Sequence, residues 1–276
     1  MNNFDNGILI VAHPDDECLF ASSILQSISI LIICFNEIPK EEDISFKRFN
    51  SVKLYPLRDL KVISLNLKQS EKAFLPINWL NINERFSGIS GGYKKKSYDS
   101  NYKKILNKLK EIIPKNSLII SHNPWGEYGH AEHCQVFKAS FQIAKETNSR
   151  FFVNSYFSNL SKVYAQRKLH LFKSINFLFE TNINLYNLLK NHYSKFGCWT
   201  WYENYKLPKN ESFFEIDLEK NPSLINSRRY KIKDFSLIFI KHTNPFKYYM
   251  FSILKKFIPK NYQILLRKFF LKKLFK

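Results

Sequence analysis

Residues 7–17 constrain this chain more than any other stretch, because a short apolar run leads directly into a polar turn. Residues 8–12 are all apolar, too few for an ordinary helix and β-branched enough for a buried strand. Pro14 disfavours a helical backbone at His13 and suits the first turn of a helix. The pattern predicts a strand that ends at His13, followed by a helix that opens with three acids, where the helix dipole favours negative charge.

The same alternation of strand and helix continues through the first half of the chain. Further strands are expected at 30–35, 61–67, 118–121 and 151–156, and helices at 15–26, 44–55, 98–113 and 130–147. This order predicts an α/β fold with a Rossmann-like, mainly parallel sheet flanked by helices on both faces. No Gly-x-Gly-x-x-Gly follows the first strand, which argues against a dinucleotide cofactor.

The second half of the chain is less regular. Residues 160–191 are expected to be mostly helical, residues 198–205 form an aromatic loop, and strands are expected at 213–216 and 237–241. None of the apolar runs reaches the roughly 18 residues that a membrane-spanning helix needs. The four cysteines include no Cys-x-x-Cys pair, so reduced thiols in a cytoplasmic protein are expected.

The net charge of +20 implies an acidic partner, and its distribution points to the C-terminus. Residues 244–276 hold nine Lys or Arg and no acid, interleaved with apolar residues at helical spacing. We expect a basic amphipathic helical tail at 244–276 after a catalytic domain at 1–243. Such a tail is typical of contact with an anionic membrane, here the inner face, but packing on the domain explains the pattern too. No nucleic-acid-binding motif supports a third interpretation, a nucleic-acid partner.

Two stretches carry the residues of a metal site. His13-Pro-Asp-Asp-Glu17 follows the first strand, and a histidine-rich stretch at 122–133 follows the strand at 118–121. Parallel strands end at the same edge of a sheet, so the two stretches can meet there. His13, Asp16 and His133 supply the three protein ligands that catalytic zinc takes. Asp15 would stand beside a water molecule and accept its proton, as a general base does.

The two motifs also carry a resemblance to a known family. Ala12-His-Pro-Asp-Asp-Glu17 and Gly129-His-Ala-Glu-His133 resemble the leading and second motifs of the PIG-L/LmbE-like zinc deacetylases, over about residues 6–155. The resemblance implies zinc as the cofactor and several residue roles: His13, Asp16 and His133 as ligands, Asp15 as general base, His130 as the group that steadies or protonates the intermediate, and Tyr128 as the group that polarises the substrate carbonyl. The chain departs from the family at Ser51, where a Glu is usual, and at 18–23, which replace a glycine-rich run.

Four further residues are candidates for substrate binding. Arg48 matches a family arginine that binds substrate hydroxyls or phosphate, and Trp125, Trp199 and Trp201 are aromatic residues that can stack on a sugar. For the tryptophans, packing within the loop or the core is the alternative. His122 is expected to support the site rather than bind metal, and Glu17 and Glu132 are expected to orient histidines.

These features predict a zinc-dependent hydrolase that removes the N-acetyl group from an amino sugar of the N-acetylglucosamine type. The expected substrate is an N-acetylated sugar or a lipid-linked glycan, made during the biosynthesis of bacterial surface glycans. Two alternatives stay open: another zinc amidase, acting on a thiol conjugate, and a catalytically idle binding protein docked at membranes. The presence of Asp15 favours an enzyme, because an idle protein would not need a base. The oligomeric state is not constrained.

Overall fold

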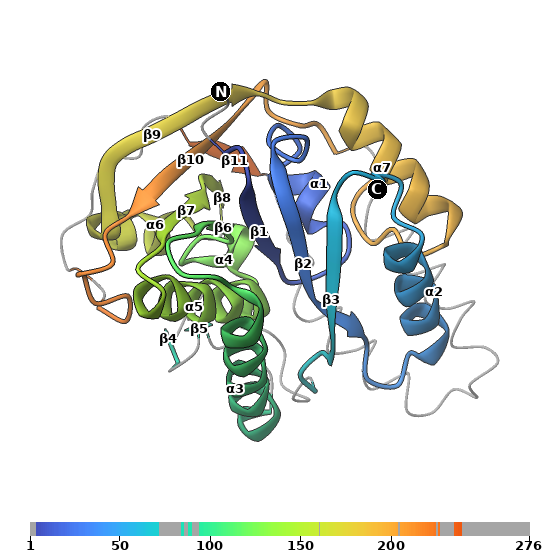
Figure 1. Ribbon diagram of the computed structural model, residues 1–276, viewed down its shortest axis with the longest axis horizontal. Coiled ribbons are helices and arrows are strands. Elements are labelled where there is room, and N and C mark those ends of the chain that lie inside the picture. Colours follow the sequence, from blue (N-terminus) through green and yellow to red (C-terminus); the bar gives the residue numbers. More distant parts are fainter. Residues whose placement is uncertain are drawn as a thin grey trace.

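A seven-stranded sheet forms the centre of the structure, a computed structural model (Figure 1). It describes residues 4–71, 94–159, 161–203, 205–224, 226 and 235–238, with the backbone of 84–85 and 88–89. The strands lie in the spatial order β3-β2-β1-β6-β7-β10-β9. Their bounds are β1 Gly7–Val11, β2 Ile28–Glu37, β3 Lys61–Lys68, β6 Leu118–Ser121, β7 Arg150–Asn154, β9 Phe172–Glu180 and β10 Asn210–Ile216.

The first five strands in this order run parallel, β10 pairs antiparallel with β7, and β9 pairs antiparallel with β10. The prediction of a mainly parallel α/β fold is therefore confirmed. Two short pairs lie outside the main sheet: β8 Tyr156–Ser158 with β11 Ser236–Ile238, and β4 Glu84–Arg85 with β5 Gly88–Ile89. The helices are α1 Asp16–Phe20, α2 Glu42–Lys53, α3 Lys95–Ile112, α4 Gly126–Gly129, α5 Ala131–Glu146, α6 Lys162–Lys168, the 3-10 turn Leu169–Leu171 and α7 Ile183–Lys195.

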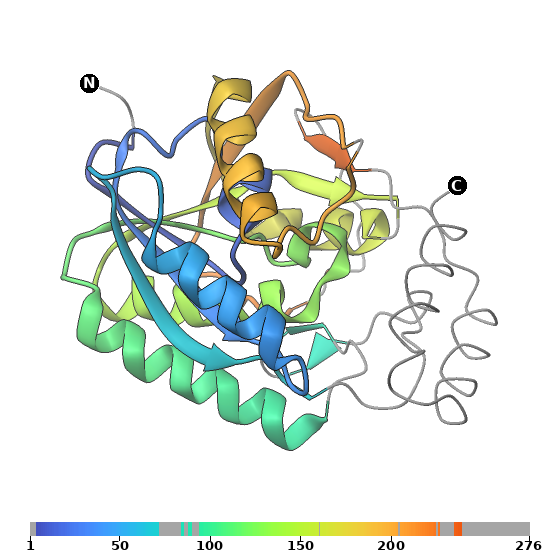
Figure 2. The same cartoon turned by 90° about the vertical axis from the view of Figure 1, so that its right-hand side faces the viewer.

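Helices cover both faces of the sheet, and β1 shows why. Its side chains alternate between the faces, as a strand requires. Ile8 and Ile10 belong to the core that holds α3 and α5, whereas Leu9 and Val11 belong to the core that holds α1 and α7. Figure 2 shows α3 below the sheet and α7 above it. A strand that is apolar on both faces is typical of a parallel sheet buried between two helical layers.

The helix expected at 15–26 is shorter in the structure, and the reason is a buried carboxylate. α1 ends at Phe20, and the chain continues through turns to Ser27. Glu211 of β10 accepts hydrogen bonds from the Ser22 hydroxyl (3.2 Å) and from the backbone N–H of Ser23 (2.7 Å). The amide of Ser23 is thereby withdrawn from any continuing helix.

The expectation that residues 160–191 are mostly helical is wrong for its middle part. Residues 172–180 form strand β9, which pairs antiparallel with β10. Phe177 and Phe179 both pack against Phe4, at ring distances of 5.6 and 5.5 Å, so the true period is two. Ile175, which fitted the helical spacing, is 43% exposed. Pairing with β10 decides this segment, and β10 lies thirty residues further along the chain.

The predicted tail at 244–276, and most of the strand expected at 237–241, lie outside the described residues. None of the helices in the described part of the chain is both long and apolar enough to span a bilayer.

Candidate metal centre

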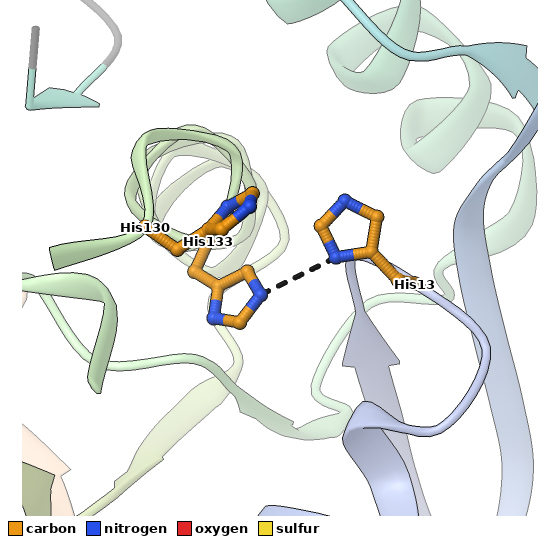
Figure 3. Close-up of side chains that lie close together, drawn as sticks. All are labelled: His13, His130 and His133. Carbon is orange, nitrogen blue, oxygen red and sulfur yellow. Dashed lines mark hydrogen bonds between the residues drawn. The ribbon is translucent and has the colours of Figure 1, made fainter. Parts of the chain in front are cut away.

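The two predicted motifs meet at one edge of the sheet. β1 and β6 are adjacent and parallel, so the turns that follow them lie side by side. His13 stands just after β1, and His133 lies in the first turn of α5. Figure 3 shows both rings, with His130, pointing toward one another from these two elements.

Three donor atoms form a nearly regular triangle at this edge. His13 Nδ1 lies 3.2 Å from Asp16 Oδ2, His133 Nε2 lies 3.3 Å from the same oxygen, and the two nitrogens are 3.3 Å apart. Zinc bonds of about 2.0–2.2 Å in tetrahedral directions place neighbouring donors roughly 3.3–3.5 Å apart. The triangle therefore has the size of one face of a zinc tetrahedron. We refer to His13, Asp16 and His133 as the metal centre.

A carboxylate holds the far nitrogen of each ring. Glu132 Oε2 lies 2.9 Å from His13 Nε2, and Glu127 Oε2 lies 2.6 Å from His133 Nδ1. Each far nitrogen then carries the proton and donates it, which leaves the lone pair of the near nitrogen directed into the triangle. The expectation that Glu132 orients a histidine is confirmed.

Glu127 connects the metal centre to the rest of the second motif. Its backbone has φ 53°, in the left-handed region that costs a non-glycine residue energy. Its carboxylate also accepts hydrogen bonds from Asn154 Nδ2 (2.6 Å) and from the backbone N–H of Asn123 (3.3 Å). Although burial opposes ionisation, the neighbouring His122 and His133 lower the pKa of Glu127 to about 2. A strained residue with this many partners marks a site that the fold holds in place.

The preceding Gly126 permits this turn. It has φ +64°, and a Cβ there would lie 2.9 Å from the sulfur of Cys134. Any larger residue would push the turn away from α5.

His122 borders the triangle, with its Nε2 3.5 Å from Asp16 Oδ2, so the expectation that it supports the site rather than binds metal stays a prediction. Its Nε2 accepts the backbone N–H of Ala12 at 2.9 Å, and its Nδ1 lies 3.1 Å from Glu127 Oε2. The Ala12 amide can donate only to an unprotonated nitrogen, so His122 is neutral and carries its ring proton on Nδ1, which donates to Glu127. Its contacts fasten the end of β1 to the second motif.

Asp15 lies beside the metal centre in a strained conformation. Its φ is 96°, and its backbone N–H donates to Glu17 Oε2 at 3.1 Å. The Thr200 hydroxyl donates to Asp15 Oδ2 at 2.8 Å. Burial, and then the charge of Asp16, raise the pKa of Asp15 to about 6, against the opposing charge of Arg48. A carboxylate held in this way is poised to take up a proton near neutral pH.

Tyr128 and His130 stand at the outer side of the triangle, and both are partly exposed. The His130 ring lies 4.9 Å from the His13 ring and 4.5 Å from the His133 ring. His13, His130 and His133 offer nitrogens within 4.8 Å of one another, and so do the donor atoms of Asp16, His122 and His133. The Tyr128 ring lies 5.5 Å from His133 and 5.2 Å from Trp201.

Of the four residues predicted to bind substrate, three have buried N–H groups without protein partners among the described residues. Arg48 Nε and Nη1, Trp199 Nε1 and Trp201 Nε1 are buried, and within the described part of the chain they have no hydrogen-bond partner. The charge of Arg48 acts on Asp15, and Thr200, which bonds Asp15, stands between the two tryptophans. We call Arg48, Trp199 and Trp201 the donor set.

The expectation that Trp125 contacts substrate is wrong. The side chain is 0% exposed, and its indole N–H donates to the backbone carbonyl of Tyr156 at 2.7 Å. Its ring stacks on Phe172 and Phe235 at 5.7 and 5.8 Å. Trp125 is a core residue that anchors the loop, which was the alternative interpretation.

Sequence reasoning assigned Glu17 the wrong partners and missed Glu127 and Thr200. Glu17 contacts none of the described histidines; it accepts from the hydroxyls of Tyr193 (2.6 Å) and Tyr55 (3.1 Å) and from the Asp15 amide. Glu127 could have been noticed as the acid six residues before His133, at a Gly-Glu turn. Thr200 carries no such signal, since 185 residues separate it from Asp15.

Comparison with known proteins gives matches to the fold rather than to a sequence family. No protein-family model matches the chain. An uncharacterised protein of Acanthamoeba polyphaga mimivirus is 23% identical over 185 residues, which cover 63% of this chain and 74% of the relative.

Two solved structures share the arrangement of elements. The zinc-inhibited form of teicoplanin deacetylase has a TM-score of 0.50 and 12% identity, over 76% of this chain and 97% of that one. The deacetylase of the A40926 pseudoaglycone has a TM-score of 0.51 and 12% identity, over 78% of this chain and 99% of that one. At this identity the likeness concerns fold alone, and by fold this chain is similar to these two deacetylases.

Proposed function

We propose that the protein is a zinc-dependent N-deacetylase that acts on an N-acetylated amino sugar of a glycoconjugate. The observation that carries the proposal is the triangle of donor atoms, with edges of 3.2–3.3 Å and a buried carboxylate beside it. The similarity in fold to two deacetylases agrees with this chemistry.

His13, Asp16 and His133 would hold the zinc ion. Two nitrogens and one carboxylate oxygen are a donor set that zinc accepts, and three protein ligands leave a coordination position for catalysis. When bound, zinc acidifies water and polarises a carbonyl. Glu127 and Glu132, which fix the two rings, keep both lone pairs aimed at the ion before it arrives.

Asp15 would move the proton. As a water oxygen attacks the acetamide carbon, Asp15 accepts the proton that the water loses. The same proton then passes to the leaving nitrogen, the C–N bond breaks, and acetate and a free amine result. Thr200 holds one oxygen of Asp15 by a hydrogen bond of 2.8 Å, which fixes the carboxylate in one orientation. The partly exposed Tyr128 and His130 would stabilise the negative charge that develops on the carbonyl oxygen.

The donor set supports a sugar as the substrate. Buried N–H groups without protein partners are costly, so they favour a ligand that brings acceptors. A sugar presents many hydroxyl oxygens, and its apolar ring face packs on aromatic side chains such as Trp201. The ring of Trp201 lies 5.2 Å from Tyr128, which connects the donor set to the metal centre.

The test combines metal content with acetate release from the purified protein. Zinc should bind the wild type at one ion per chain, and His133→Ala should lose it. His170→Ala is the matched control, because His170 lies outside the site and bonds the Arg167 carbonyl. Acetate should be released from N-acetylglucosamine carried on a nucleotide, a lipid or a glycan, assayed at stoichiometric and at excess zinc. The excess arm matters because a protein of similar fold is known in a zinc-inhibited form.

The outcomes separate the claims. If zinc binds at one ion per chain but no acetamido sugar releases acetate, the proposed metal centre stands and the proposed deacetylase activity is contradicted. If zinc binds the His133→Ala variant as tightly as the wild type, the proposed metal centre is contradicted.

A further inference from the structure

An open groove lies between α2 and the β2–β3 edge of the sheet, apart from the metal centre. It encloses about 500 Å³, within the range of small-molecule sites. β3 is an edge strand, and Figure 1 shows α2 beside it. The lining of this groove includes no residue of the metal centre, of the carboxylates that hold it or of the donor set.

The walls of the groove are mainly apolar. Phe49 and Val52 of α2 face Leu57, Leu60 and Val62 at the start of β3. Phe49 is 45% exposed, although its neighbour on the helix, Val52, is buried. From residue 60 to residue 64 the strand rises about 13 Å. This length and these walls suit a flexible apolar chain laid along β3.

Two cations stand in the lining. Lys53 and Arg58 both line the groove, and the lining contains no acid. Both side chains are exposed, and among the described residues neither has an ion-pair partner. An acidic group on the ligand would meet two unpaired cations and no repulsion.

At the other end the groove holds an unused acceptor. Asn36 is 3% exposed, and its Nδ2 donates to the Ser64 hydroxyl at 2.7 Å. Its Oδ1 is buried and has no hydrogen-bond partner in the described part of the chain. Leaving a buried acceptor without a partner costs free energy, so this atom favours a ligand with a hydroxyl or amide donor.

We propose that this groove binds an anionic amphiphile, an apolar chain that carries a phosphate or carboxylate. The acid lies against Lys53 and Arg58, and the chain follows β3 between Val52 and Val62. A polar donor meets Asn36. The occupant is a lipid separate from the substrate, because the lining includes no residue of the metal centre or of the donor set. Binding itself does not depend on the deacetylase reaction.

Calorimetric titration of the full chain with dodecyl phosphate tests the proposal. We expect saturable binding that is at least tenfold tighter than that of dodecyl maltoside or inorganic phosphate. Across alkyl phosphates, each added methylene should tighten binding roughly three- to fourfold until the groove is filled. Equal affinity for the neutral and the anionic probe, or no saturable binding, would overturn the proposal.

Paired variants locate the site. Phe49→Asp should weaken binding of dodecyl phosphate at least tenfold, whereas Phe46→Asp, on the same helix and 66% exposed but outside the lining, should leave it unchanged. Arg58→Glu should weaken binding, whereas Lys61→Glu, an exposed cation outside the lining, should not. Thermal unfolding of each variant shows whether it is folded. Equal losses in test and control variants would mean that the amphiphile binds elsewhere.

One further arm tests whether the lipid is separate from the substrate, and it rests on the proposed function. Dodecyl phosphate should leave the hydrolysis of an alkyl-linked and of a free N-acetylated sugar equally unchanged. Competition with the alkyl-linked sugar alone would assign the groove to the substrate and overturn the proposal of a separate lipid. Absence of any hydrolysis would count against the deacetylase and leave the binding result intact.

Discussion

The metal centre and the donor set differ in how their buried polar atoms are satisfied. In the metal centre each ring has a carboxylate at its far nitrogen and a lone pair directed into the triangle, so the protein supplies every ligand and support that an ion needs. In the donor set, buried N–H groups of Arg48, Trp199 and Trp201 have no partner among the described residues. The first region is complete for an ion, whereas the second is complete only with a ligand that supplies acceptors.

Substitution of Asp15 should have the largest effect on catalysis. Asp15→Asn keeps the size and the hydrogen bond to Thr200 but cannot accept a proton. We expect kcat for acetate release to fall about 10²- to 10⁴-fold, the usual contribution of a general base. Zinc content should stay at the wild-type value, because Asp15 is not in the triangle.

Asp43→Asn is the matched control for that change, since Asp43 is a largely exposed acid on α2. Its kcat should equal that of the wild type. A fully active Asp15→Asn would show that another group takes the proton and that Asp15 is not the general base.

Glu127 tests whether the metal centre is complete in advance. Glu127→Gln removes the charge that faces His133 Nδ1, so the ring loses its fixed orientation and part of its basicity. We expect zinc affinity to fall about 10- to 100-fold, measured by competition with a chelator of known affinity. Glu146→Gln, at the exposed end of α5, should have wild-type affinity.

The residues around Asp15 show which parts of the site could be predicted from the sequence and which could not. The three ligand candidates and Asp15 lie in two short motifs at the ends of neighbouring strands, and local patterns determine both. Glu127 acts through a backbone with positive φ, which a sequence pattern does not display. Thr200 and Arg48 reach Asp15 from segments whose position depends on the packing of α7 and α2 against the sheet. Residues 172–180 were predicted as helix for a related reason, since their strand exists only through its pairing with β10.

The donor set should respond differently from the metal centre. Arg48→Met removes a buried charge whose Nε and Nη1 have no partner in the described chain, so its loss costs the folded protein little. We expect KM for the sugar to rise roughly tenfold to a hundredfold, as for a lost hydrogen bond to a charged group, with an unchanged or higher Tm. Lys47→Met, which removes a neighbouring cation paired with Asp43, should leave KM unchanged. A lower Tm with unchanged KM would make Arg48 a structural residue.

Glu211 is a third kind of buried carboxylate, and it isolates what the imidazoles do. Within the described part of the chain it accepts hydrogen bonds from neutral donors alone: the Ser22 hydroxyl, the Ser23 amide and the Tyr156 hydroxyl. Burial raises the pKa of Glu211 above its ordinary value, whereas the neighbouring histidines lower the pKa of Glu127 to about 2. The two acids are equally buried, so the difference comes from the imidazole N–H groups that face Glu127.

The smallest expected effect is the pH dependence of stability that Glu211 causes. Its sign follows from the raised pKa of Glu211 in the folded protein. Between the unfolded and the folded pKa of Glu211, the folded protein holds a proton that the unfolded chain has lost. The contribution of this group to the free energy of unfolding is therefore full below about pH 4.5 and decreases as pH rises through the folded pKa, by at most about 1.4 kcal/mol per pH unit. Glu211→Gln removes that decrease, so urea unfolding from pH 4 to pH 8 should show the wild type losing stability relative to the variant.

Glu215 provides the opposite case on the same strand. Despite burial, hydrogen bonds from Arg150 and Lys173 lower the pKa of Glu215. Its contribution is present above its ordinary pKa and disappears as pH falls, so Glu215→Gln should differ most from the wild type at neutral pH and least in acid. If both variants follow the same pH trend, the cations around a buried carboxylate do not set its behaviour in this fold. The contrast between Glu127 and Glu211 would then have no electrostatic basis.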